Sequence, residues 1–145
     1  MTSAIIIEVD GIPKGQPRPR AFSRGGKARV HDPGTAECWK GAIALTAIPL
    51  RPASPLTGPL RVTITFYMPR PKRLMRKIDP TYAIPHTATP DADNLAKAVL
   101  DCLTEIGMWV DDSQVYKLNI EKLYHAKGDR PGAVIHMFVQ DEDDE

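Results

Sequence analysis

The chain of 145 residues has the length of one domain with a single modest core, and its 42% hydrophobic and 26% charged residues are typical of a globular protein. Its formal net charge of +1 hides an asymmetry, because the last five residues, DEDDE, are acidic and the remainder has 19 basic against 13 acidic residues. No apolar run approaches the ~18 residues of a membrane span and the opening lacks the basic region of a signal peptide, so a membrane partner is excluded and a cytoplasmic protein is expected. We expect one domain over residues 1–140 and an acidic C-terminal tail over 141–145.

The first part of the chain predicts one strand and an irregular, basic segment. Residues 4–10 place their odd-numbered side chains, all apolar, on one face of a strand. Residues 11–34 are rich in Gly, Pro and Arg. They hold at most a short hairpin around residues 24–29, which turns at Gly25-Gly26.

A helix and the clearest strand pattern follow. Residues 36–47 carry apolar side chains at helical spacing, with Thr35 as a cap, and the helix ends at Ile48 because a residue before proline is driven out of helical backbone. Residues 60–68 alternate strictly between apolar and polar side chains, as a strand with one buried face does. Residues 69–90, rich in proline and basic residues, predict a long mobile loop.

The second half of the chain predicts one more helix and two strands. The helix over 93–106 has a buried apolar face and ends at Gly107. Strands are expected over 115–125 and 132–140, joined through a polar turn. Because strands and helices do not alternate regularly, the fold class is α+β, a single compact domain with a small mixed β-sheet flanked by helices.

The cysteines and histidines show no pattern of their own. Cys38 and Cys102 are too few for a disulfide framework and indicate a reduced interior. The four histidines lack the spacing of zinc ligands. Neither residue type therefore predicts a metal site.

Two acidic motifs are the most informative feature of the chain: PDADNLAK at 90–97 and GMWVDDSQV at 107–115. Asp91 and Asp93 lie two apart at the start of a helix, and a turn after that helix can bring Asp112 beside them. Mg²⁺ binds a few carboxylate oxygens and fills its other positions with water or substrate oxygens. The first hypothesis is therefore a metal-dependent phosphodiesterase.

Ordinary structural roles compete with this hypothesis. Asp is a common helix cap, and the pair Asp111-Asp112 could form an ordinary turn. Asp93, Lys97 and Asp101 fall on one face of a helix, where they could form a surface ladder of ion pairs or place a lysine beside a scissile phosphate. Sequence spacing leaves both interpretations open. Without a metal, carboxylates packed this closely repel one another, so at least one is expected to have a raised pKa.

Two basic clusters indicate a phosphate backbone as a partner. The first cluster consists of Lys14, Arg18, Arg20, Arg24, Lys27 and Arg29. The second consists of Arg70, Lys72, Arg73, Arg76 and Lys77. Such clusters are often solvated loops, but two of them on one small domain, beside a candidate metal site, favour DNA binding.

In order and spacing, PDADNLAKAVLDCL and GMWVDDSQV resemble the motifs of the RusA-type Holliday-junction resolvases, small endonucleases common in phages and prophages. IPKGQPRPRAF, in the N-terminal part, is a weaker match to the Arg-rich opening of that family. One departure is Thr89, at a position that is often basic in relatives, which implies a lost or displaced backbone contact. The resemblance implies a RusA-like fold and a phage- or prophage-encoded protein of DNA recombination and repair in a bacterial cell.

The resemblance also implies a homodimer that cuts two opposed strands of a four-way DNA junction, with Mg²⁺ as cofactor and Mn²⁺ as a substitute. It places catalytic carboxylates, which would bind the metal, at Asp91, Asp93 and Asp112, and a catalytic lysine at Lys97. Asp111 also matches, as a weaker ligand or an outer anchor. The dimer contact is expected on the helix over 36–47 or on apolar strand surface.

Two alternatives remain open at this point. One is a junction- or DNA-binding protein without catalysis, in which the aspartates only cap helices and turns. The other is a metal-dependent nuclease that acts on other branched DNA or on ordinary duplex.

Overall fold

The main sheet is mixed and has five strands in the order β1-β7-β4-β6-β5. In the computed structural model, which describes residues 2–16, 21–24, 27–30 and 34–140, these strands are β1 (Thr2–Asp10), β7 (Gly132–Gln140), β4 (Leu60–Met68), β6 (Val115–Tyr124) and β5 (Ile84–Pro85). β4 and β6 are parallel, and the other neighbouring pairs are antiparallel. The sheet confirms the predicted α+β class with a small mixed β-sheet.

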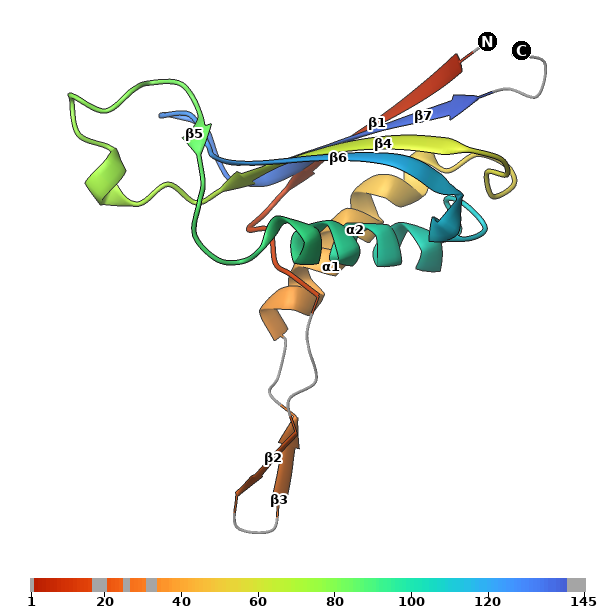
Figure 1. Cartoon of the computed structure of the whole chain (residues 1–145), viewed down its shortest axis with the longest axis horizontal. Helices are drawn as coiled ribbons and strands as arrows, with labels where there is room; N and C mark the ends of the chain where they lie inside the picture. Colours follow the sequence, from red (N-terminus) through yellow and green to blue (C-terminus); the bar gives the residue numbers. More distant parts are fainter. Residues whose placement is uncertain (1, 17–20, 25–26, 31–33, 141–145) are drawn as a thin grey trace.

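Both helices, α1 (Gly34–Ala47) and α2 (Ala92–Glu105), lie on the same face of this sheet (Figure 1). The core lies between them and the sheet. In β4 the apolar side chains of the predicted alternation are buried, and their polar neighbours are half-buried or exposed on the other face. None of the helices in the described part of the chain is long and apolar enough to cross a membrane.

The helix boundaries differ slightly from those that the sequence predicts. α1 begins at Gly34, so Thr35 lies inside the helix and is not the cap that the sequence predicted. Because the N–H groups of a first turn have no partner within the helix, this turn can begin before the apolar repeat does. α2 begins at Ala92, with Asp91 at the N-cap position. It ends as predicted, because Gly107 adopts a positive φ of 79° that closes the helix.

The loop over 69–90, expected to be mobile, is tied to the body of the protein by hydrogen bonds. The guanidinium of Arg70 contacts backbone carbonyls on both sides of the loop, and Lys127 donates to two further carbonyls, those of Arg76 and Asp79. Figure 1 shows this loop and β5 at the end of the sheet away from the N-terminus. The loop leads from β4 into the start of α2.

The predicted hairpin is present as a separate two-stranded sheet. β2 (Ala21–Arg24) and β3 (Lys27–Val30) are antiparallel, and Arg24 pairs with Lys27. The predicted turn at Gly25-Gly26 lies outside the described residues, as does the predicted acidic tail over 141–145. In Figure 1 the hairpin stands apart from the main sheet.

Candidate active site

A surface hollow of about 170 Å³ lies between α2 and β6. Its lining consists of Asp93, Ala96, Lys97, Leu100 and Asp101 from α2, Asp112 from the turn before β6, and Leu118 and Ile120 from β6. The three residues predicted to share one helix face therefore do so, and that face looks onto the hollow. Three carboxylates and one ammonium group line the hollow together with four apolar side chains.

The start of α2 does not use Asp91 as an ordinary cap. Asp91 occupies the N-cap position and its backbone carbonyl accepts the hydrogen bond from the N–H of Leu95, but its side chain makes no capping bond. Asp93, in the first turn, is exposed. Both carboxylates lie near the positive end of the helix dipole, which stabilises negative charge.

The two acids of the second motif have different roles. The Asp111 side chain accepts a hydrogen bond from the backbone N–H of Ser113 at 3.3 Å and caps the turn that follows it. Asp112 lines the hollow instead. The preceding Trp109 is buried, and its indole N–H donates to the Thr104 hydroxyl at 2.7 Å, which anchors the turn to the end of α2. An ordinary turn therefore explains Asp111 but not Asp112.

The sequence analysis did not single out Gln114, which fixes the shape of this turn. Its side-chain oxygen accepts hydrogen bonds from the backbone N–H groups of Val110 and Asp111, both at 2.9 Å. Its amide nitrogen donates to the carbonyls of Leu56 and Gly58, both at 3.0 Å. The available signal was the spacing Asp-x-x-Gln, which is typical of a capping box.

The carboxylates of the turn perturb each other. A hydrogen bond with Asp111, slight desolvation and the negative charges of Asp111 and Asp101 raise the pKa of Asp112, and the positive charge of Lys97 partly offsets them. The hydrogen bond from the Ser113 backbone, followed by the one with Asp112, lowers the pKa of Asp111. The expectation that at least one carboxylate has a raised pKa is confirmed.

The predicted gathering of Asp91, Asp93 and Asp112 at one point does not occur within a single chain. Asp91 does not line the hollow. Among the described residues, no three His, Cys, Asp or Glu side chains lie close enough to hold one metal ion. The reason is the length of α2, whose 14 residues span about 21 Å, so that a residue before the helix and a residue after it are kept apart.

The aspartate side chains at the site offer the type of ligand atom that a hard divalent cation binds. Carboxylate oxygens are the protein ligands that Mg²⁺ prefers, and two or fewer of them per ion leave positions for water and phosphate. Within one chain Asp93, Asp101 and Asp112 line the hollow, whereas Asp91 lies outside its lining. Asp101 was not predicted to be a metal ligand or a catalytic residue.

The beginning of the segment that carries the first basic cluster packs against α2 next to Asp93. The backbone N–H of Gln16 donates to the carbonyl of Asn94 at 3.3 Å. Gly15 lies so close to Asn94 that an added Cβ would be 2.2 Å from the Asn94 side-chain nitrogen. Only glycine therefore fits at residue 15 without a shift, and the basic segment is joined to the helix that carries Asp93.

The second basic cluster divides into exposed and buried members. Lys72 and Arg73 are exposed in a short 3₁₀ turn, Lys72–Leu74. Arg70 is only 8% exposed, and its guanidinium donates at 2.7 to 3.4 Å to the carbonyls of Leu74, Pro80, Tyr82 and His125. These four bonds occupy four of its five N–H donors. The prediction that Arg70 contacts DNA is therefore corrected to a structural role.

The first basic cluster remains a prediction for the most part. Arg18 and Arg20 lie outside the described residues, and the structure describes Arg24, Lys27 and Arg29 by backbone alone. Lys14 is half-buried.

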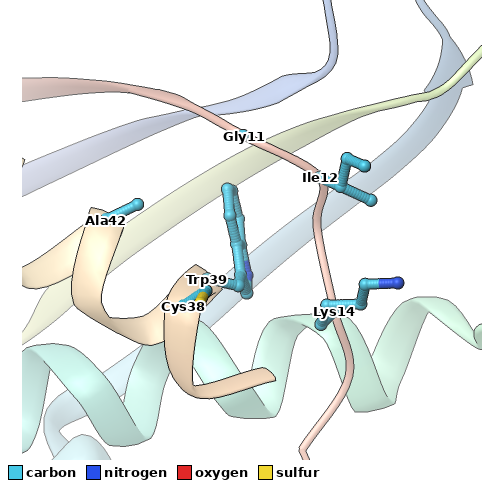
Figure 2. A pocket seen from close by; sticks show the side chains of 6 residues that line it. All are labelled: Gly11, Ile12, Lys14, Cys38, Trp39 and Ala42. Carbon is cyan, nitrogen blue, oxygen red and sulfur yellow. The ribbon is translucent and has the colours of Figure 1, made fainter. Parts of the chain in front are cut away.

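Lys14 borders a second hollow, of about 250 Å³, at the start of α1 (Figure 2). The other lining residues are Gly11, Ile12, Cys38, Trp39 and Ala42. Figure 2 shows the Lys14 amine pointing away from the Trp39 ring. Because no carboxylate lines this hollow, it is not the candidate active site.

Comparisons with known proteins identify the family to which this fold belongs. The family described as "Endodeoxyribonuclease RusA" matches residues 10–137. A protein of Bacillus subtilis (strain 168), named uncharacterized protein YqaN, is 36% identical over 126 residues, 83% of this chain and 87% of that protein. The crossover junction endodeoxyribonucleases RusA of Escherichia coli (strain K12) and Enterobacteria phage 82 are each 26% identical over 114 residues, 79% of this chain and 82% of theirs.

The fold and the hollow thus define a small α+β protein with a carboxylate-rich surface site. The chain belongs to the RusA family of endodeoxyribonucleases.

Proposed function

We propose that this chain is a Mg²⁺-dependent, structure-specific endodeoxyribonuclease that resolves four-way DNA junctions by paired phosphodiester cuts on opposed strands. The observation that carries the proposal is the hollow where Asp93, Lys97, Asp101 and Asp112 meet. Membership of an endodeoxyribonuclease family supports the cleavage of DNA, and the names of the E. coli and phage relatives support a crossover junction as substrate.

Each group at the site has a part in this chemistry. Asp91, Asp93 and Asp112 would hold the cation, and Asp101 would add a carboxylate beside Asp112. When bound, Mg²⁺ would supply an activated water and neutralise charge on the phosphate oxygens, and Mn²⁺ would substitute for it. Lys97 lies one helical turn from Asp93 on the same face, so its ammonium would stabilise the negative charge that develops on the scissile phosphate.

Exposed basic residues would hold the DNA arms. Lys72 and Arg73 lie in the loop that leads through β5 to Asp91. Lys14 and the basic residues of 18–29 would extend this surface. Contacts of this kind position the duplex without reading its sequence.

A homodimer would supply the two sites that paired cuts require, since a two-fold pair of chains matches a two-fold junction. The edge of β6 next to the hollow supports this part of the proposal. β5 pairs only with Leu123 and Tyr124, so residues 115–122 of that edge have no neighbouring strand in the described part of the chain. A second copy that docks along this edge would bring the carboxylates of two chains together.

Mixing of inactive chains tests the shared site. We expect Asp91→Asn and Asp112→Asn chains, each inactive alone, to nick junctions after they are mixed and allowed to exchange subunits, because one site of the mixed dimer would keep both carboxylates. If the mixture stays inactive although subunits have exchanged, each chain holds its own complete site and the dimer proposal loses this argument.

The function itself is tested on a synthetic four-way junction and on a linear duplex of the same sequence, each with and without Mg²⁺. We expect paired symmetric nicks in the junction alone, only with Mg²⁺. Asp93→Asn should lower the rate roughly 100-fold or more while the junction stays bound, because several kcal/mol of transition-state stabilisation depend on the metal. Asp129→Asn, an exposed acid in the turn between β6 and β7, is the matched control and should cleave normally.

Each other result selects one of the alternatives. Tight binding to the junction without nicks from the wild-type protein would make the chain a junction-binding protein. Equal cleavage of the junction and the duplex would make it a general nuclease. Normal turnover by Asp93→Asn would remove Asp93 from the metal site.

A further inference from the structure

The segment that leads into Asp91 is held against the neighbouring strand β6. We call residues 86–90 the approach segment. Its first residue, His86, donates its backbone N–H to the carbonyl of Lys122 at 3.1 Å, and its ring packs against Tyr124 with a centroid distance of 4.6 Å. Residues 87–89 are exposed. The approach segment is therefore anchored at its beginning by β6.

The ammonium group of Lys122 anchors the other end of the approach segment. Its Nζ donates to the carbonyl of Ala88 at 2.5 Å and to the carbonyl of Pro90 at 2.7 Å. The side chain is half-buried. Charge-assisted bonds of this length are roughly twice as strong as neutral ones. Lys122 thus binds three backbone groups of the approach segment, one through its carbonyl and two through its ammonium.

This contact connects two walls of the candidate site. Pro90 directly precedes Asp91, which opens α2, and Lys122 lies two residues beyond Ile120, which lines the hollow from β6. We propose that Lys122 is a positioning residue, which sets Asp91 and the first turn of α2 against β6 and touches neither metal nor DNA. The proposal deepens the proposed function, because it assumes that Asp91 acts in metal-dependent cleavage.

Position matters here because the proposed chemistry depends on precise distances. A misplacement of about 1 Å in a reacting group can cost ~100-fold in rate. Without its ammonium partner, the carbonyl of Pro90 would turn to water, and three exposed residues would leave the start of α2 free to shift. Binding of the DNA arms would not change, because phosphate contacts come from other side chains.

Lys127, in the turn after β6, provides a matched control. Lys127 donates to the carbonyls of Arg76 and Asp79 at 2.5 and 2.7 Å, the same two-carbonyl contact as that of Lys122. Its target segment lies earlier in the loop over 69–90, away from Asp91. Lys127→Met therefore removes an equivalent contact without loosening the approach segment.

The experiment compares Lys122→Met, Lys122→Arg and Lys127→Met with the wild-type protein. Amide hydrogen exchange, measured by mass spectrometry, is read over residues 86–95. Single-turnover cleavage of the junction is measured at saturating protein over a range of Mg²⁺ concentrations, and junction binding is measured separately in Ca²⁺. Circular dichroism establishes that each variant is folded.

We expect Lys122→Met to exchange faster over 86–95 and to cleave roughly 10- to 100-fold more slowly, with a higher Mg²⁺ requirement and junction affinity within about threefold. Lys122→Arg should recover most of the rate, since it restores two donors and the charge. Lys127→Met should show wild-type exchange over 86–95 and a wild-type rate.

Three results would overturn the proposal. They are unchanged exchange over 86–95 in Lys122→Met, a wild-type rate for that variant, or an equal loss of rate in Lys127→Met. A loss of junction affinity alone would reassign Lys122 to DNA binding. If the wild-type protein itself makes no nicks, the proposed function fails, and the exchange data still decide whether Lys122 holds the approach segment.

Discussion

Replacement of Arg70 by methionine separates a structural role from DNA binding. Arg70 makes four hydrogen bonds to carbonyls while 92% of its surface is covered, and methionine keeps much of its apolar contact but none of its donors. Hydrogen bonds from a charged group contribute about 1.5–3 kcal/mol each, although the 3.4 Å bond to His125 is weak. Removal of a buried charge from water offsets part of this sum.

The net loss expected for Arg70→Met is about 3 kcal/mol in the free energy of unfolding. At about 2.1 cal/mol/K per residue, a chain of this length has an unfolding entropy near 0.3 kcal/mol/K, so the midpoint of thermal unfolding should fall by roughly 10 °C. Urea unfolding followed by circular dichroism measures the first quantity, and a thermal scan measures the second. Arg73→Met, an exposed change in the same loop, should stay within about 0.5 kcal/mol of wild type.

Junction binding completes this test. At a temperature where both variants are folded, Arg73→Met should weaken binding, and Arg70→Met should bind within about threefold of wild type. Unchanged stability together with a tenfold loss of affinity in Arg70→Met would refute the structural assignment and return Arg70 to the DNA surface.

Three further outcomes are expected. The logarithm of junction affinity should fall linearly with the logarithm of salt concentration. A double Lys72→Ala, Arg73→Ala variant should lower the magnitude of this slope by about two. An unchanged slope would exclude these two side chains from the DNA surface. Gln114→Ala should lower stability by about 2 kcal/mol in urea unfolding and reduce cleavage more than binding, whereas wild-type cleavage would mean that Asp112 does not depend on this turn. Burial, followed by the charge of Lys122, lowers the pKa of His86 in the folded protein below its ordinary value of 6.5. The unfolded protein therefore binds this proton more readily, so the free energy of unfolding is highest above pH 6.5 and declines as the pH falls below it. His86→Phe should therefore lose less free energy of unfolding than wild type between pH 7 and pH 5, and equal losses would contradict this.

Local patterns predicted the secondary structure well, because each depends on residues that are close in sequence. β4 was predicted at its observed ends from its alternation, and α2 within one residue from its apolar face and Gly107. The hairpin was predicted from a pair of glycines between basic residues. Start positions of helices were predicted less well, since α1 begins at Gly34, before its first apolar residue.

The site was predicted less completely, because its geometry depends on contacts between distant segments. Spacing on one helix face brought Asp93 and Lys97 together correctly. It could not reveal that Gln114 binds carbonyls 56 and 58 residues away, or that Lys122 binds carbonyls 32 and 34 residues away. Basic residues in one cluster likewise look alike in sequence, and only the fold separates the buried Arg70 from the exposed Arg73.

The polar contacts around the hollow form one physical arrangement. A carboxylate whose pKa is raised, as that of Asp112 is, binds its proton more tightly in the folded than in the unfolded protein, and therefore lowers stability at neutral pH. The segments that carry these acids would relax away from one another without other restraints. Gln114 restrains the turn before β6, and Lys122 restrains the segment before α2, each through bonds to backbone carbonyls that carry no net charge. Side chains outside the hollow thus stabilise an arrangement that its own carboxylates oppose.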